Sequence, residues 1–221
     1  MNHTSDTSVT SDIKPLMRSI LERESEAIRN IPVTDGYAQA VDMIADRVHG
    51  RGGKLIASGM GKAGQIAMNI ATTFCSTGTP AVFLHPSEAQ HGDLGIIQKN
   101  DILLLLSNSG KTNEIVDLVT LARELNPDIP IIVITGDAES RLAGLADVAL
   151  ATGGSPEVCP LGLTPTTSTT MMTVIGDVLV VAVMKKINFT VAEYAKRHHG
   201  GYLGHKSKRE ACAFNEKNSQ S

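Results

Sequence analysis

A short polar segment after an apolar run carries residue types that bind an anion. In DILLLLSNSGKTNE, residues 101–114, leucines give way to serines, an asparagine, a glycine and a threonine. A continuous apolar run bounded by turn residues is typical of a strand buried in a parallel sheet. Hydroxyl and backbone N–H groups at the start of the next helix favour an anion, and open α/β sheets bind ligands at this edge. We therefore expect a phosphate-bearing ligand. Its binding set is Ser107, Asn108, Ser109 and Thr112.

A glycine-rich turn, SGMGKAG over residues 58–64, follows the first predicted strand and opens a helix. It contains GxGxxG in the context that a dinucleotide site requires. A dinucleotide fold also needs an acid at the end of the second strand, where this chain has His85. The alternative is that Lys62 holds an anion, because a lysine at a helix N-terminus opposes the macrodipole. Further ligand-binding residues expected in this turn are Ser58, Gly59 and Gly61.

Two acids are candidates for proton transfer. Glu114 falls in the first turn of the helix after the polar segment, where an acid also simply complements the dipole. Glu157 lies in a loop between Pro156 and Pro160. If that loop is dry, the pKa of Glu157 would rise toward the working range of a general base. The alternative is an ordinary exposed loop acid.

The polar loop 86–95 and its surroundings hold two histidines and an acid. His85, His91 and Asp93 are residue types that bind zinc, but their spacing matches no standard motif. We expect no required metal, and at most adventitious or inhibitory zinc at His85. His91 is assigned to the ligand site, at the mouth of the pocket.

Strands and helices alternate through the middle of the chain. Apolar runs predict strands at 54–58, 81–84, 101–106, 130–135 and 148–151. Helical patterns lie at 61–76, 112–125 and 139–145. Such alternation is typical of a doubly wound parallel α/β sheet.

The flanking segments predict further helices and two tails. Two helices between 11 and 48 are separated by Pro and Gly residues. The apolar residues of 165–187 are too many for one stripe, so that helix should be buried on several sides, in part by a subunit interface. A short helix is expected at 190–198. Residues 1–10 and 207–221 are polar, and we expect both tails to be disordered.

The composition is that of an ordinary globular protein. The chain has 221 residues, 42% of them hydrophobic, and a formal net charge of −3, which gives no basic surface for nucleic acid. Its cysteines, Cys75, Cys159 and Cys212, suit reduced thiols in a cytosol. The apolar run 171–184 is too short to span a bilayer, and the polar N-terminus is no signal peptide. We expect a cytoplasmic protein without a membrane partner.

Five motifs resemble those of the arabinose-5-phosphate isomerase family, within the sugar isomerase (SIS) superfamily. They are SGMGKAG, FCSTGTPAVFLHPSEAQHGDLG, LSNSGKTNEI, EVCPLGLTPTTSTT and YAKRHHGGYLG, in this order between about residues 51 and 204. The resemblance implies a flavodoxin-like three-layer αβα sandwich with a five-stranded parallel sheet. It also implies a single SIS domain over 11–206, the short form without the CBS domains that family members often carry.

The resemblance further implies an aldose–ketose isomerase that interconverts D-arabinose 5-phosphate and D-ribulose 5-phosphate. This reaction feeds synthesis of the sugar Kdo for lipopolysaccharide or capsule, and it needs no cofactor. Alternatives are an isomerase of a phosphoheptose or hexulose phosphate, or a non-catalytic phosphosugar sensor. Family resemblance and the long apolar helix favour a homotetramer built as a dimer of dimers.

Residue-by-residue carry-over from the family gives a catalytic set. It comprises Lys62, Glu114, Glu157 and His198. Lys62 would stabilise the enediolate, and one of the two glutamates would move the proton between C1 and C2. His198 would assist ring opening, because imidazole titrates near neutrality. The family often has His-Pro-Gly-Gly where this chain has HHGG, and alignment on the glycine pair favours His198 over His199.

Overall fold

The apolar runs form one five-stranded, all-parallel sheet with strand order β2-β1-β3-β4-β5. The computed structural model describes residues 13–218, and the side chains of residues 13–213. The strands are β1 (Leu55–Gly59), β2 (Ala81–Phe83), β3 (Ile102–Leu106), β4 (Ile131–Thr135) and β5 (Val148–Ala151). This order belongs to the flavodoxin-like class of doubly wound sheets, as predicted.

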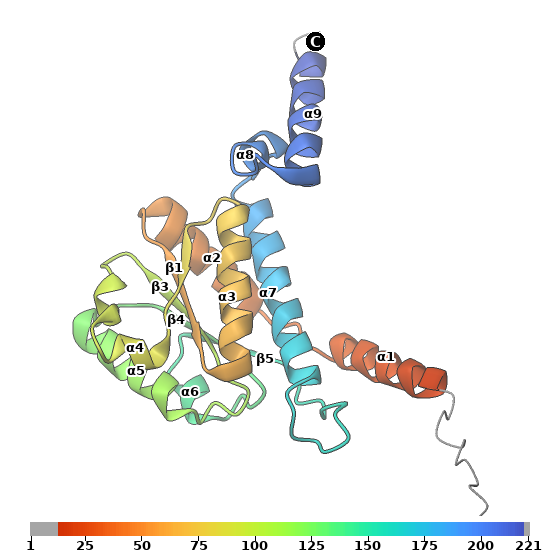
Figure 1. The fold of residues 1–221 in the computed structure, drawn as a ribbon. Helices are drawn as coiled ribbons and strands as arrows, with labels where there is room; N and C mark the ends of the chain where they lie inside the picture. Colours follow the sequence, from red (N-terminus) through yellow and green to blue (C-terminus); the bar gives the residue numbers. More distant parts are fainter. Residues whose placement is uncertain (1–12, 219–221) are drawn as a thin grey trace, which may run out of the picture.

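Helices connect and flank the strands (Figure 1). The α-helices are α1 (Ile13–Arg29), α2 (Gly36–Ile44), α3 (Gly61–Ser76), α4 (Pro86–Ala89), α5 (Asn113–Leu125), α6 (Arg141–Gly144), α7 (Thr167–Lys186), α8 (Val191–Ala195) and α9 (Gly201–Asn218). A π-helical segment, η1 (Ala45–Gly50), continues α2, and a 3-10 turn, η2 (Asp93–Ile96), follows α4. The polar loop predicted at 86–95 therefore holds α4 and the start of η2.

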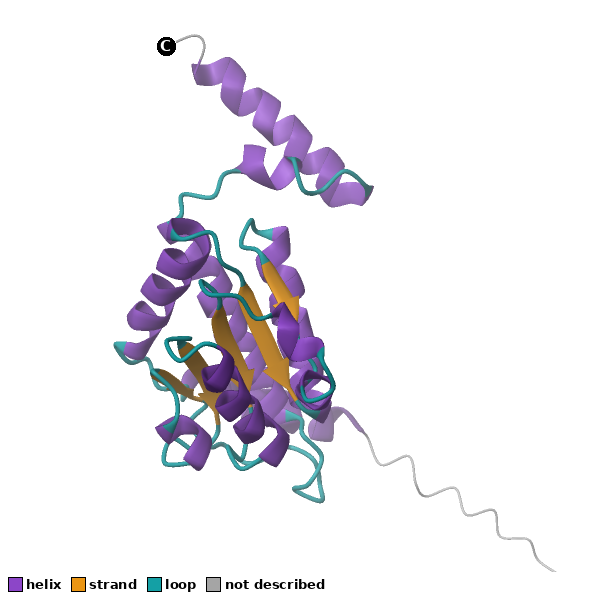
Figure 2. Cartoon of the chain, turned by 90° about the vertical axis from the view of Figure 1, so that its left-hand side faces the viewer, coloured by secondary structure: helices purple, strands orange, loops and turns teal. Residues whose placement is uncertain are grey.

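Two apolar layers sandwich the sheet, which confirms the three-layer prediction (Figure 2). Helices α2, α3 and α7 pack on one face, where Phe74 and Ile175 are fully buried. Helices α4, α5 and α6 cover the other face, where Ile115 and Leu142 are fully buried. Strands β1, β3 and β4 are buried on both faces, so their sequences read as continuous apolar runs.

Strand register brings the ligand-binding turns together. Leu55 pairs with Ile102 and Gly59 pairs with Leu106, so β1 and β3 end at the same level. The glycine-rich turn after β1 and the polar turn after β3 therefore lie side by side at the carboxyl edge of the sheet. This is the edge at which open α/β sheets bind ligands.

Helix α7 is the long apolar helix that the sequence predicts. By length and composition it could cross a membrane, but half of it is buried inside the domain. It packs on α3, α1 and α2, and its inward side joins the core, as in a core helix of a soluble domain. Val178 and Val181 remain 45% and 64% exposed on its outer side.

The prediction of a disordered tail from residue 207 is wrong for residues 207–218, which belong to α9. This stretch contains good helix formers such as Lys, Glu and Ala, and Lys206 forms an i,i+4 ion pair with Glu210. Among residues 207–213, whose side chains are described, only Ser207 is buried, and a polar composition suits such a helix. The tail predicted at 1–10 and the last three residues lie outside the described part of the chain.

Candidate active site

A cavity of about 260 Å³ lies at the carboxyl edge of the sheet, bordered by the turns after β1 and β3 and by the start of α7. Met60, Leu106 and Met172 supply apolar lining. The polar lining consists of Lys62, Ser107, Asn108, Ser109, Thr112, Ser168 and Thr169. The structure thus gathers five of the predicted site residues in one place.

The turn after β3 is held in a compact shape by its own hydrogen bonds. The N–H of Gly110 donates to the carbonyl of Ser107 over 3.2 Å, and the hydroxyls of Ser107 and Thr112 lie 3.0 Å apart. The N–H of Lys111 donates to Oγ of Ser109 over 3.2 Å. Gly110 has a φ of +60°, and a Cβ there would lie 2.0 Å from Oγ of Ser140. Only glycine fits this position.

The turn after β1 requires glycine for a different reason. A Cβ on Gly59 would lie 2.9 Å from the carbonyl of Ala63, and one on Gly64 would lie 2.4 Å from the carbonyl of Gly59. Strand β1 and helix α3 therefore approach each other closely. This approach places Lys62 in the first turn of α3, exposed and lining the cavity, next to Gly61.

Three helix N-termini meet at this cavity. Lys62 and Ala63 belong to the first turn of α3, Thr112 is the N-cap of α5, and Ser168 and Thr169 belong to the first turn of α7. Each helix presents the positive end of its dipole there. Together with the lysine, they make a strongly favourable environment for an anion such as a phosphate.

Glu157 is bound to the start of α7. Its Oε2 accepts hydrogen bonds from the Thr166 N–H over 2.6 Å, the Thr166 hydroxyl over 2.8 Å and the Ser168 N–H over 3.3 Å. Glu157 does not line the cavity itself, but its carboxylate is bound to Ser168, which does. The expectation of a raised pKa is wrong. Desolvation acts to raise the pKa of Glu157, but hydrogen bonds from Ser168 and Thr166 outweigh it and lower the pKa.

The remaining predicted residues do not line the cavity. Glu114 is half-buried in the first turn of α5, two residues after Thr112. Ser58 is fully buried near the end of β1, with no hydrogen-bond partner for its hydroxyl within the described chain. Gly59 is likewise buried. His91 is exposed in the loop between α4 and η2.

His198 lies far from the cavity of its own chain. Helix α7 starts at the cavity and runs for 20 residues, about 30 Å, before the chain turns into α8. Figure 1 shows α8 and α9 beyond that far end. The His198 ring stacks on Tyr194 with centroids 3.7 Å apart, and its Nδ1 lies 3.0 Å from the Tyr194 carbonyl. The structure therefore does not bring His198 together with Lys62 within one chain.

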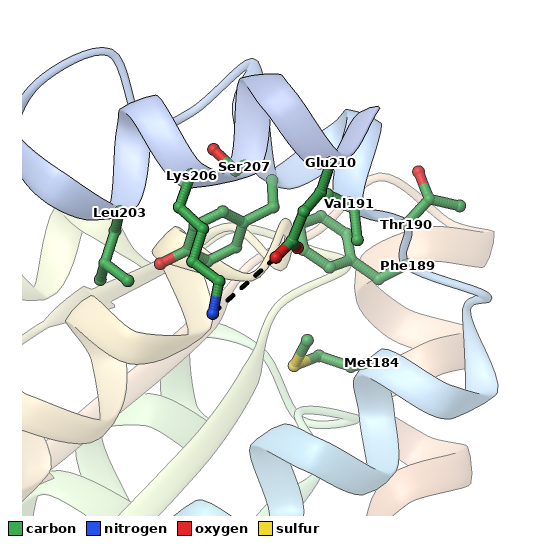
Figure 3. Close-up of a pocket in the computed structure, with 9 residues that line it drawn as sticks. Met184, Phe189, Thr190, Val191, Leu203, Lys206, Ser207 and Glu210 are labelled. Carbon is green, nitrogen blue, oxygen red and sulfur yellow. Dashed lines mark ion pairs between the residues drawn. The ribbon is translucent and has the colours of Figure 1, made fainter. Parts of the chain in front are cut away.

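A second cavity of about 260 Å³ lies at that far end, between the end of α7 and helices α8 and α9 (Figure 3). Met184, Phe189 and Leu203 make it largely apolar. Its charged lining residues, Lys206 and Glu210, pair with each other over 3.8 Å. Its lysine is paired with an acid, and it has no hydroxyl-rich turn like the one after β3, so the first cavity is the candidate active site.

The candidate metal ligands around His85 do not converge on one point in the described part of the chain. Within residues 13–213, whose side chains are described, no three His, Cys, Asp or Glu side chains come together in a group that could hold a metal ion. His85 is half-buried, with its ring 6.3 Å from that of Phe83 and its Nδ1 buried without a partner in the described chain.

The predicted site set contains no residue from the start of α7. Ser168 and Thr169 nevertheless line the cavity. The run of hydroxyl residues 166–170, which opens an otherwise apolar helix, is the signal that could have placed them there. Glu24, which accepts a hydrogen bond from Thr167, gave no signal, because 143 residues separate the two.

The fold and the cavity define an open α/β protein whose sheet carries, at its carboxyl edge, a cavity that favours an anion. Comparison with known families narrows this class. The SIS domain family matches residues 50–182, and the chain belongs to this family.

Curated relatives include arabinose 5-phosphate isomerases. KdsD of Escherichia coli K12 is 41% identical over 196 residues, which cover 88% of this chain and 58% of KdsD. KdsD of Francisella tularensis is 42% identical over 201 residues, covering 90% of this chain and 60% of that protein. The chain thus spans about three fifths of the length of these relatives. The resemblance predicted from the motifs is confirmed.

Two of the solved structures that this chain resembles are matched over nearly their whole length. A Bacteroides fragilis protein, assigned as a phosphosugar isomerase involved in capsule formation, is 64% identical with a TM-score of 0.85. The match covers 86% of this chain and 99% of that one. The c3406 protein of E. coli CFT073, solved in complex with arabinose 5-phosphate, is 32% identical with a TM-score of 0.78. That match covers 90% and 100% of the two chains.

Proposed function

We propose that this protein is an arabinose-5-phosphate isomerase, which interconverts D-arabinose 5-phosphate and D-ribulose 5-phosphate through an enediolate. The observation that carries this proposal is the cavity, where three helix N-termini, a hydroxyl turn and Lys62 surround space for a small anion. The relatives named arabinose 5-phosphate isomerase and the c3406 complex with this sugar phosphate support the choice of sugar.

The site offers a group for each step of the reaction. The turn after β3 would hold the phosphate, with Ser107, Ser109 and Thr112 as donors. Lys62 would carry the counter-charge of the enediolate oxygen as it forms. Glu157 or Glu114 would take the proton from one carbon and return it to the next. Aldose–ketose interconversion moves one proton and exchanges no electrons with a cofactor, so we propose that none is needed.

We also propose that the active form is a homotetramer in which His198 comes from a neighbouring copy. Within one chain, a helix about 30 Å long separates His198 from the cavity. Exposed apolar side chains on α1 and on the outer side of α7 provide surface for such contacts. The enzyme would act in the cytoplasm and supply a precursor of Kdo for lipopolysaccharide or capsule.

The deciding experiment is an isomerisation assay with purified protein. Arabinose 5-phosphate should yield ribulose 5-phosphate, and Lys62→Ala should abolish most of the turnover while Lys99→Ala, a matched exposed lysine outside the cavity, should not. A panel of other pentose, hexose and heptose phosphates tests specificity. Protein that binds phosphosugars without converting any of them would instead be a sensor, and the proposal would be wrong.

A further inference from the structure

Helix α1 lies against the start of α7 (Figure 1) and reaches the loop that carries Glu157. The guanidinium Nη2 of Arg23 donates to the carbonyl of Glu157 over 2.9 Å. From the next residue, Oε1 of Glu24 accepts the hydroxyl hydrogen of Thr167 over 2.8 Å. Two consecutive residues of α1 thus contact the backbone of the Glu157 loop and the first turn of the helix to which its carboxylate binds.

Thr167 links Glu24 to that loop. Its hydroxyl has one hydrogen, which it donates to Glu24, so its oxygen lone pairs face the loop. There the N–H of Val158 donates to Oγ1 of Thr167 over 3.1 Å. Val158 is the residue after Glu157. The Val158 N–H and the Glu157 carbonyl belong to the same peptide group. Thr167, held by Glu24, therefore binds this peptide group at its donor, and Arg23 binds it at its acceptor.

Glu24 makes its contact with Thr167 at the cost of burying an unpaired carboxylate oxygen. Its Oε2 is buried and has no hydrogen-bond partner within the described chain. Leaving a buried carboxylate oxygen unpaired is unfavourable, and such groups call for a reason other than stability. The N–H groups of Thr166 and Ser168 at the start of α7 are already bound to Glu157, so Glu24 is restricted to the Thr167 hydroxyl.

We propose that Glu24, acting through Thr167, is a positioning residue that holds Glu157 beside the cavity in the geometry needed for proton transfer. This inference rests on the isomerase function proposed above and assigns a role in it to α1. Glu24 itself does not line the cavity, so its effect is on the orientation of Glu157 and not on substrate binding. Misplacing a catalytic group by as little as about 1 Å lowers turnover by up to about 100-fold.

The first test does not rely on activity. It measures whether the contacts from Glu24 through Thr167 to Val158, here called the clamp, hold the Glu157 loop in place. Hydrogen–deuterium exchange of the segment 157–168 should be faster in Glu24→Ala than in the wild type, because the loop loses its fixed partner. Glu22→Ala is the matched control, since Glu22 is an exposed acid on the same helix. Unchanged protection of 157–168 in Glu24→Ala overturns the inference, whatever the activity of the wild type.

The second test separates positioning from stability. In Glu24→Ala we expect kcat to fall about 10- to 100-fold with little change in KM. Glu24→Gln keeps an oxygen that can accept from Thr167 and should recover most of kcat, and Thr167→Ser should do better than Thr167→Val. Faster exchange with unchanged kcat overturns the positioning role. If the wild type converts no phosphosugar, the isomerase proposal fails and the positioning role fails with it, and the exchange data still report whether the clamp exists.

Discussion

The two ends of helix α7 carry different chemistry. Its first turn lines the cavity with Ser168 and Thr169 and binds the carboxylate of Glu157. Its last turn leads through Phe189 to α8 and His198, where the neighbouring cavity is largely apolar. One end therefore presents hydroxyl groups and a bound carboxylate, and the other leads to His198 in the loop between α8 and α9. If both ends act in one reaction, a complete site needs two copies of the chain.

The largest expected effect tests the ion-binding end. Whichever of Glu157 and Glu114 carries the proton, its replacement by glutamine should lower kcat by about 10²- to 10⁴-fold, the usual contribution of a general base. Initial rates at saturating arabinose 5-phosphate give the values. Near-normal turnover in either variant would remove that glutamate from the mechanism and leave the other as the proton carrier.

A mixing experiment tests whether the two ends of α7 act together in one site that is shared between copies. Lys62→Ala and His198→Ala homomers should each be nearly inactive. Subunit exchange between them should restore about a quarter of wild-type activity, because a site that takes the two residues from different copies is intact one time in four. The specific activity after mixing equal amounts is the measurement. No recovery, despite exchange confirmed by native mass spectrometry, would mean that one chain supplies both residues.

A smaller effect is expected from the hydroxyl turn alone. Thr112→Val removes one donor to the phosphate and should raise KM for the phosphosugar about 10-fold, with kcat less affected, since a hydrogen bond to a charged group contributes about 1.5–3 kcal/mol. Steady-state kinetics give both constants. Thr120→Val, on the outer surface of the same helix, is the matched control and should leave KM unchanged. An equal rise in KM in the control would point to a general effect on α5.

The smallest expected effect concerns pH and the carboxylate at the start of α7. Desolvation opposes ionisation of Glu157, yet its hydrogen bonds from Ser168 and Thr166 hold its pKa below the ordinary value of 4.5. A lowered carboxyl pKa stabilises the fold above the unfolded-state value, and this stabilisation is lost as pH falls through the folded-state value.

Glu157→Gln should therefore be less stable than the wild type at neutral pH, and the difference should shrink well below pH 4.5. Urea unfolding midpoints at neutral pH and at about pH 3 measure this change. Glu22→Gln, at an exposed position, serves as the control, and its stability difference from the wild type should be the same at both pH values. If the stability difference between Glu157→Gln and the wild type were larger at acid pH, the direction assigned to the pKa of Glu157 would be contradicted.

The central sheet and the two turns proposed to bind phosphate follow from local sequence. The run of leucines before Ser107 specifies a strand buried on both faces, and glycines 59 and 110 allow contacts that a side chain would block. The polar turn could be predicted because its residues are adjacent in the chain. Its register with the turn after β1 could be expected from the rule that parallel strands end at a common edge.

Features that depend on distant partners could not be predicted. The sequence around Glu157 gave no sign that Thr166 and Ser168 would bind its carboxylate and lower its pKa, and the prediction there had the opposite sign. Nor could it place His198 at the far end of α7. The helix over 207–218 was missed because polar composition resembles disorder when few side chains are buried.

The hydroxyls of Ser107 and Thr112 lie 3.0 Å apart, so one donates to the other and only one of their two hydrogens is left for a ligand. A charged phosphate oxygen accepts that hydrogen more strongly than a neutral sugar hydroxyl does. Under the proposed function, this turn therefore favours the esterified end of the sugar, and discrimination begins before the ring opens.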